Sequence, residues 1–453
     1  MTTNSVTLSL PSDRWDVIEE PFKGDVLKRQ LLAQQLTGYL ARLRDGAVIA
    51  LDAPWGEGKT WFTQHWAAQL RKDGHAVGMI DAFQQDYVED PFMLVAGEIL
   101  RLCATNKSMV DKLRERAGSV MSAILPVAVK ATINVAGRAL GTTDLVDEFS
   151  EAAKEAVKSG TGKAADVAKV WVEKKLAAHE SDKHSLRAFR DALAEFASTQ
   201  AEPVVILVDE LDRCRPAFAV RLVERIKHFF DVPNLVFVLV MNRQQLEMAI
   251  KGVYGADTDA STYLSKFLNL ALTLPSLRSW QIDEIGHPIK QFVGTVLRRF
   301  KYQDNFEKVA TAATVWALVF DLSLRDIERM CSLYFLSGRS WPGLVTYLAA
   351  MKLKHPQTFA GFRSQEPKAY ENATRMLSNA RERVSAPQHT TETLRSYLES
   401  MMGLLVMAGG SESNDAREAL QRGYDFIYGE VVPQIRPRHA FNQVVQALDF
   451  DLQ

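Results

Sequence analysis

Residues 53–60, Ala-Pro-Trp-Gly-Glu-Gly-Lys-Thr, have the types and spacing of a loop that binds phosphate. In such a loop, backbone N–H groups and the start of the next helix surround phosphate oxygens, and Gly56 and Gly58 let the backbone come close. Lys59 can reach the β- and γ-phosphates, and Thr60 can bind Mg²⁺. Position 53 is Ala where the usual pattern has Gly. The predicted nucleotide contacts are Pro54, Trp55, Gly56, Glu57, Gly58, Lys59, Thr60 and Trp61.

The residues on either side of this loop predict the elements that must position it. Residues 47–51 form a continuous apolar run, which is typical of a parallel strand buried on both faces. After the loop, Phe62, Trp66 and Leu70 recur at four-residue spacing and predict one buried helical face. This context favours a phosphate loop over the alternative, a glycine-rich helix entry without a ligand.

Two acids follow a second apolar run, residues 204–208. At the carboxyl end of this predicted strand, Asp209 can hold the water shell of a metal ion opposite Thr60. Glu210 can orient and deprotonate an attacking water. Many strands end in an acidic turn, so the second motif is weak by itself. Together the two motifs supply complementary parts of nucleoside triphosphate hydrolysis.

Residues 55–60 and 208–216 resemble the KAP family of P-loop NTPases, whose members typically carry W-G-x-G-K-[ST] and D-[DE]-L-D-R-C motifs. The resemblance covers about residues 15–335 and implies a Mg²⁺-dependent ATPase. Asn242 replaces the acid that often ends the next strand in the family, and in related ATPases Asn there senses γ-phosphate or water. Further similar segments are 238–243, 263–266, 274–275 and 323–329.

Three cations are candidates for stabilising the transferred phosphoryl group. By resemblance, Arg325 is the lid arginine that senses nucleotide. Arg213 can act on phosphate, or it can form a structural ion pair with Asp209 and Asp212. Lys266 is the weaker third candidate.

Apolar residues at three-residue spacing in 322–330 predict one buried helical face, from which Arg325 points away. The alternative for Arg325 is a surface pair with Asp321 or Glu328. Trp55 can shield the phosphates or the adenine, or it can pack against the sheet edge. We expect ATP and not GTP, because Asn-Lys-Ser-Met at 106–109 lacks the acid of the guanine signature.

Strands alternating with helices predict an α/β P-loop NTPase fold with a doubly wound parallel sheet, whose ligand site lies at the carboxyl ends of the strands. Beyond residue 275 the pattern is helical. We expect an NTPase core at 15–275 with a helical insertion at about 105–185, a helical lid at 276–355 and an all-helical C-terminal region at 356–453. The expected strands are 47–51, 77–81, 204–208, 235–241 and 268–274, and the expected core helices include 59–71 and 217–230.

Many family members carry a transmembrane hairpin between the two motifs. Here the most apolar piece, residues 119–141, contains Lys130 and Arg138, and the longest uncharged run is 117–129, whereas a helical span needs about 20 residues. We expect a soluble helical insertion, with two amphipathic helices in 145–178. A peripheral membrane contact is the alternative.

Composition favours a cytoplasmic protein. The formal net charge of −1 does not indicate nucleic acid, and the basic and aromatic cluster at 298–302 is short. Cys103, Cys214 and Cys331 are isolated, so neither a disulfide framework nor a zinc site is predicted. The N-terminus lacks the pattern of a secretory signal.

Bacterial relatives in the KAP family look like parts of antiviral defence modules, so the resemblance implies the motor or switch of such a module. It also implies protein partners from a multi-gene system and leaves a homo-oligomer open. A second class is a nucleotide-gated scaffold with little turnover that recruits an effector through residues 336–453. The third is a membrane-peripheral ATPase, which rests only on residues 119–141.

Overall fold

The computed structural model describes residues 15–124, 184–275 and 288–449, apart from positions 44, 89, 105, 230, 301, 303–304, 339, 385–391, 412 and 429–435. Five parallel strands form one sheet in the order β2-β3-β4-β1-β5, which confirms the predicted fold class. The strands are β1 (Ala47–Asp52), β2 (Val77–Asp81), β3 (Val204–Asp209), β4 (Leu235–Met241) and β5 (Leu270–Thr273). Val, Ile and Leu dominate the central strands because helices cover both faces of the sheet.

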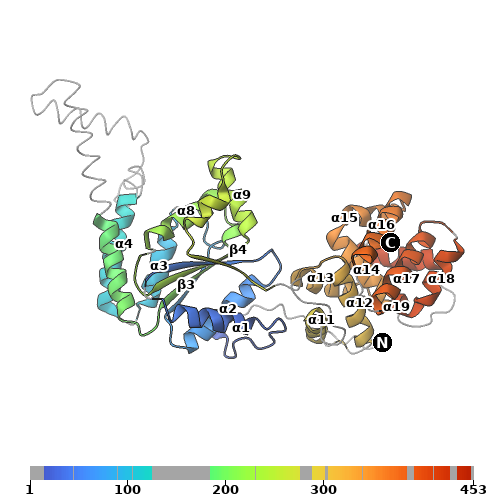
Figure 1. Cartoon of the computed structure of the whole chain (residues 1–453), viewed down its shortest axis with the longest axis horizontal. Helices are drawn as coiled ribbons and strands as arrows, with labels where there is room; N and C mark the ends of the chain where they lie inside the picture. Colours follow the sequence, from blue (N-terminus) through green and yellow to red (C-terminus); the bar gives the residue numbers. More distant parts are fainter. Residues whose placement is uncertain are drawn as a thin grey trace, which may run out of the picture.

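Figure 1 shows α1 (Arg29–Leu40) and α2 (Lys59–Lys72) on one face of the sheet. The apolar stripe predicted for α2 is confirmed, since Phe62, Trp66 and Leu70 are fully buried. The other face carries α3 (Phe92–Leu102), α8 (Pro216–Ile226) and α9 (Arg243–Tyr254). Shorter elements are η1 (Trp15–Val17), η2 (Leu211–Arg213), η3 (Lys227–Phe229) and α10 (Ala260–Ser265).

The insertion begins with α4 (Lys107–Ile124), which packs through Leu113 and Val120 into the same core as Phe189 and Leu193 of a helical run at 184–198. The amphipathic helices expected in 145–178, and the apolar stretch from 125 to 141, lie outside the described residues. Within the described part of the chain, no helix is long and apolar enough to span a membrane.

After β5 the chain is helical, as expected. Trp316, Tyr347, Tyr397 and Phe441 belong to one buried core, so helices on both sides of residue 355 pack together. The division at 355 remains a prediction. The helices are α11 (Pro288–Arg299), α12 (Phe306–Val319), α13 (Leu324–Leu336), α14 (Pro342–Lys354), α15 (Pro356–Arg363), α16 (Pro367–Val384), α17 (Glu392–Ala408), α18 (Asn414–Arg422), α19 (Tyr424–Tyr428) and α20 (Pro437–Asp449).

Candidate functional site

The sheet order brings the predicted site residues to one edge. Strand β4 lies between β1 and β3, so Asn242, directly after β4, lies between the phosphate loop after β1 and Asp209 at the end of β3. Asp52 is in register with Met241, and the amide of Ala53 donates to the Met241 carbonyl at 3.1 Å. Parallel strands present their carboxyl ends together, and this places the three motifs side by side.

The phosphate loop has the backbone conformation that its glycines permit. Gly56 (φ +83°) and Gly58 (φ +75°) are left-handed, and Gly58 caps the start of α2. The Lys59 ammonium is buried and turns back on its own loop, donating to the carbonyls of Ala53 at 2.8 Å and Pro54 at 3.4 Å. Burial lowers the pKa of Lys59, and the charge of nearby Asp212 opposes that shift.

Asp209 is suited to a cation. Asp209 is 1% exposed, and its Oδ1 accepts a hydrogen bond from the Glu210 amide at 2.8 Å. Its Oδ2 is buried and accepts no hydrogen bond from the described residues. Burial, reinforced by the charge of Glu210, raises the pKa of Asp209 to about 7. A buried carboxyl oxygen that accepts no hydrogen bond from the described residues, on a side chain that interacts with the Thr60 hydroxyl, fits the oxygen ligands that Mg²⁺ prefers.

Glu210 is held at both carboxylate oxygens. Thr60 Oγ1 donates to Oε1 at 3.1 Å, and Arg213 Nε lies 2.5 Å from Oε2. Burial raises the pKa of Glu210, and the charge of Arg213 opposes that rise. The structural ion pair considered for Arg213 therefore exists, but its partner is Glu210 and not Asp209 or Asp212. Glu210 has a left-handed backbone (φ +58°), and its side chain contacts both Thr60 and Arg213.

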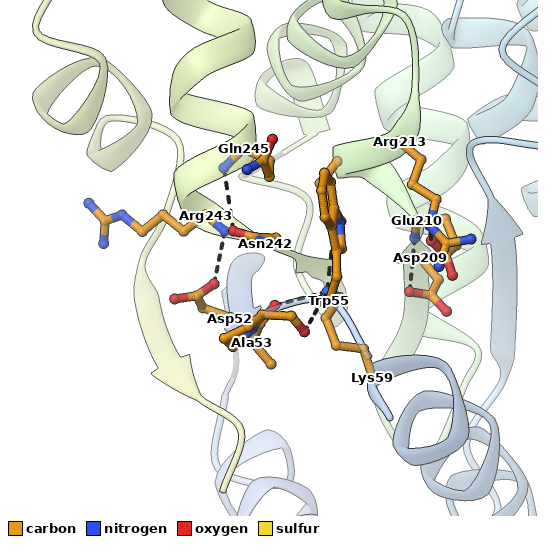
Figure 2. A network of polar contacts seen from close by, with 12 residues as sticks. Asp52, Ala53, Trp55, Lys59, Asp209, Glu210, Arg213, Asn242, Arg243 and Gln245 are labelled. Atoms are coloured by element: carbon orange, nitrogen blue, oxygen red, sulfur yellow. Dashed lines mark hydrogen bonds and ion pairs between the residues drawn. The ribbon is translucent and has the colours of Figure 1, made fainter. Parts of the chain in front are cut away.

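Asp212 contacts two residues of the phosphate loop, Lys59 and Trp55. Its side chain is 0% exposed and lies 3.9 Å from the Lys59 ammonium. Its Oδ2 accepts the indole N–H of Trp55. Trp55 is 46% exposed, so it does not pack against the sheet edge as one interpretation expected. In the view of Figure 2 its ring stands between Asn242 and Glu210.

Asn242 is oriented by backbone contacts at the start of α9. Its Oδ1 accepts the amide of Gln245 at 3.4 Å, which leaves the side-chain amide nitrogen available as a donor. Asp52, at the end of β1, accepts the next amide, that of Arg243, at 2.8 Å (Figure 2). Asp52 is not among the site residues predicted from the sequence, although its position as an acid directly before the phosphate loop could have indicated it.

Helix α13 lies directly on the phosphate loop. The amide of Arg325 donates to the Gly56 carbonyl at 3.2 Å, and a Cβ at Gly56 would lie 2.5 Å from Ser323 Oγ. The buried face predicted for this segment is confirmed, since Leu324, Ile327 and Met330 are buried while Arg325 is exposed. Glu328, one surface partner considered for Arg325, instead binds Arg299 at 3.0 Å.

A cavity of about 390 Å³ opens between the N-terminal segment, the phosphate loop and the helices α11 and α13. Arg325 and Thr60 both line it, so it borders the phosphate site. Lys266 does not line it. The wall consists of Gly24, Asp25, Val26, Leu27, Arg29, Gly56, Gly58, Thr60, Trp61, Gln64, Phe292, Thr295, Arg299, Leu324, Arg325 and Glu328.

Comparison with solved structures finds similar chains at low identity. The ORC2 protein of Aeropyrum pernix in ADPNP-ADP complexes is 13% identical over 97% of this chain and 98% of that chain, with a TM-score of 0.32. Its ADP form is 12% identical over 94% of each chain, with a TM-score of 0.33. Cdc6p from Pyrobaculum aerophilum is 12% identical over 95% of this chain and 99% of that chain, with a TM-score of 0.36.

No curated protein matches the chain. The model of the KAP family P-loop domain matches residues 29–331, which is more than half of the chain and includes the phosphate loop, Asp209, Asn242 and Arg325. This match confirms the family that the two motifs indicated. The chain belongs to the KAP family of P-loop NTPases and carries its nucleotide-binding domain.

Proposed function

We propose that this protein is a Mg²⁺-dependent ATPase. The observation that carries the proposal is the 3.1 Å hydrogen bond between Thr60 of the phosphate loop and Glu210. It joins two motifs that are 150 residues apart in the sequence, and it places a carboxylate beside the loop where the terminal phosphate of a nucleotide would lie.

The phosphates would bind to the amides at the start of α2, with Lys59 leaving its loop carbonyls for the β- and γ-phosphate oxygens. Thr60 and Asp209 would hold Mg²⁺, which neutralises negative charge on the phosphates when it is bound. Asn242 would donate its amide to the γ-phosphate or to the attacking water. Lys59 now contacts loop carbonyls and Asp212, and Asp209 Oδ2 accepts no hydrogen bond from the described residues, so both groups can turn to a ligand.

Glu210 would position the attacking water and accept its proton. Its pKa is raised by burial, yet Arg213 opposes the rise and favours the ionised form that a base needs. Arg325, on the exposed face of α13, would stabilise negative charge on the γ-phosphate from the lid side. The base and ribose would enter the cavity beside Gly58 and Trp61.

A trapping experiment tests the activity. Glu210→Gln keeps the shape of the side chain and removes the base, so ATP should remain bound while single-turnover hydrolysis falls at least tenfold, because a positioned base contributes about 10²–10⁴-fold. Glu98→Gln is a control carboxylate on α3, paired with Arg101 away from the site. A wild-type rate in Glu210→Gln would transfer the role of base to another group, with Asp212 the next candidate.

A second function is a nucleotide-gated switch with little turnover. Two contacts of Glu210 favour it, the hydrogen bond from Thr60 and the ion pair with Arg213. They keep the base away from water until they break. Such a protein would bind ATP, change the position of its lid and recruit an effector through residues 336–453. Slow hydrolysis that an added protein partner accelerates would support the switch over a constitutive ATPase.

On family membership alone, we also propose that the ATP cycle serves a bacterial antiviral defence module in the cytoplasm, with protein partners from neighbouring genes. Phage plaque counts on cells carrying the gene and its neighbours test this. Protection should disappear in Lys59→Ala and Glu210→Gln. Equal protection by wild type and both variants would show that defence does not depend on ATP binding or hydrolysis by this protein.

A further inference from the structure

Arg29, the first residue of α1, is a charged side chain buried away from the catalytic groups. The residue is 1% exposed. Its Nε and Nη2 donate to the Pro275 carbonyl at 3.1 and 2.7 Å, and its Nη1 donates to the Gly58 carbonyl at 3.4 Å. One rigid guanidinium plane therefore joins the phosphate loop to Pro275, two residues after the end of β5.

Gly58 is enclosed by the same set of contacts. A Cβ at this position would lie 3.0 Å from Arg29 Nη1 and 3.3 Å from Leu324 Cδ1 of the lid. The Gly58 carbonyl also accepts the Phe62 amide at 3.1 Å, which is the first hydrogen bond of α2. The peptide that would lie against phosphate is thus in contact with α1, α2 and α13 at once.

Burying an arginine here is less favourable in free energy than filling the same space with an apolar side chain. Burial lowers the pKa of Arg29 to about 10, and the charges of Glu57 and Asp25 only partly oppose that shift. Both of its hydrogen-bond acceptors are neutral carbonyls, and an apolar side chain of similar volume would avoid the desolvation. What an apolar side chain could not do is hold two carbonyls from segments 217 residues apart at a fixed distance.

We propose that Arg29 is a positioning residue that holds the phosphate loop against the first turn of α13, so that a nucleotide seated in the loop sets where Arg325 lies. The proposal rests on the ATPase function above. Arg29 itself does not reach the reacting atoms. It acts through Gly58, because the loop carries the phosphates and its Gly56 carbonyl accepts the Arg325 amide at the start of α13. The Pro275 carbonyl holds the other side of the guanidinium in place.

This role predicts that loss of Arg29 affects ADP affinity, ATP affinity and turnover to different extents. Without Arg29 the loop can still bind the phosphates that ADP and ATP share, so the ADP affinity should change by less than about threefold. The loop would no longer hold α13 in position, so the extra affinity for ATP should fall by about five- to tenfold or more. Turnover should fall at least about tenfold, and the KM for ATP should rise with the lost ATP affinity.

The test compares Arg29→Lys, which keeps the charge but cannot bridge two carbonyls, with Arg29→Ala. Affinities for Mg²⁺-ADP and a non-hydrolysable ATP analogue are measured by calorimetry, and turnover is measured in parallel. Millimolar guanidinium should restore turnover and ATP preference in Arg29→Ala, because the free ion can occupy the vacated site. Arg225→Ala removes another arginine of the core, paired with Asp90, and should show neither the unequal effects nor the rescue.

Two outcomes overturn the proposal. A parallel loss of ADP affinity, ATP affinity and turnover that guanidinium does not restore would make Arg29 a structural support of the loop. Wild-type ATP preference and turnover in both variants would show that the loop and α13 do not need Arg29 for their relative position. Failure of the ATPase assignment looks different, because wild type and Lys59→Ala would then bind both nucleotides equally, whatever Arg29 does.

Discussion

The amide of Arg325 donates a 3.2 Å hydrogen bond to the carbonyl of Gly56, so the first turn of the lid helix rests on the phosphate loop. Ser323 reinforces this turn through a capping box with Asp326, which fixes where α13 begins. Any nucleotide that changes the shape of the loop therefore acts on the lid through a direct backbone contact.

Lys59→Met should raise the Kd for ATP at least tenfold, because a charge-assisted contact to phosphate contributes about 1.5–3 kcal/mol. Calorimetric titration with Mg²⁺-ATP measures this. Lys107→Met, at the exposed start of α4, is the matched control and should bind as wild type does. An unchanged Kd in Lys59→Met would contradict the assignment of residues 53–60 as the phosphate loop.

Arg213→Ala should move the acidic limb of the pH–rate profile to higher pH, by on the order of one unit. The reason is that Arg213 holds down the pKa of Glu210, which burial raises, and the base must be ionised to accept a proton. Arg215→Ala, which removes the partner of Asp86, is the control. A lower rate at every pH with an unmoved limb would instead indicate that Arg213 acts on the phosphoryl group directly.

Asp209→Asn should stabilise the nucleotide-free protein at pH 8. The pKa of Asp209 is about 7 in the folded protein against 3.8 for the free side chain, so the folded state holds an extra proton between these values. Wild-type stability contributed by this group therefore falls as pH rises from about 4 to 7, and Asn avoids that loss. We expect a gain on the order of 1–3 kcal/mol at pH 8 that shrinks toward pH 5.

Urea unfolding without Mg²⁺ at both pH values measures this gain. Added Mg²⁺-ATP should reverse the order, because it stabilises only the protein that binds it well. A variant less stable than wild type at pH 8 without metal would mean that the Asp209 charge is compensated in the empty site.

Arg325→Ala should reduce the preference for ATP over ADP by about fivefold or more, because a bidentate guanidinium contact to the γ-phosphate is available only with ATP. Arg329→Ala, four residues along the same helix and also exposed, should retain that preference. Competition binding with both nucleotides distinguishes the two variants. An equal ATP preference in wild type and Arg325→Ala would reduce Arg325 to a surface residue.

Features that depend on short stretches of sequence could be predicted. The apolar runs of β1, β3 and β4, the stripe of Phe62 and Trp66 on α2, and the buried face around Ile327 follow from local periodicity, because side-chain burial repeats with the geometry of the element. The two motifs also sufficed to indicate the family, which the match over residues 29–331 confirms.

The chemical groups of the candidate site, and the edge of the sheet at which they gather, could be predicted from the residues alone. Their partners are visible only in the folded chain: Arg213 binds Glu210, Trp55 binds Asp212, and Arg29 joins Gly58 to Pro275. Trp55 and Asp212 are 157 residues apart, and no local period relates two such positions. Their meeting depends on the strand order and on side-chain packing across the finished sheet, which are properties of the whole fold.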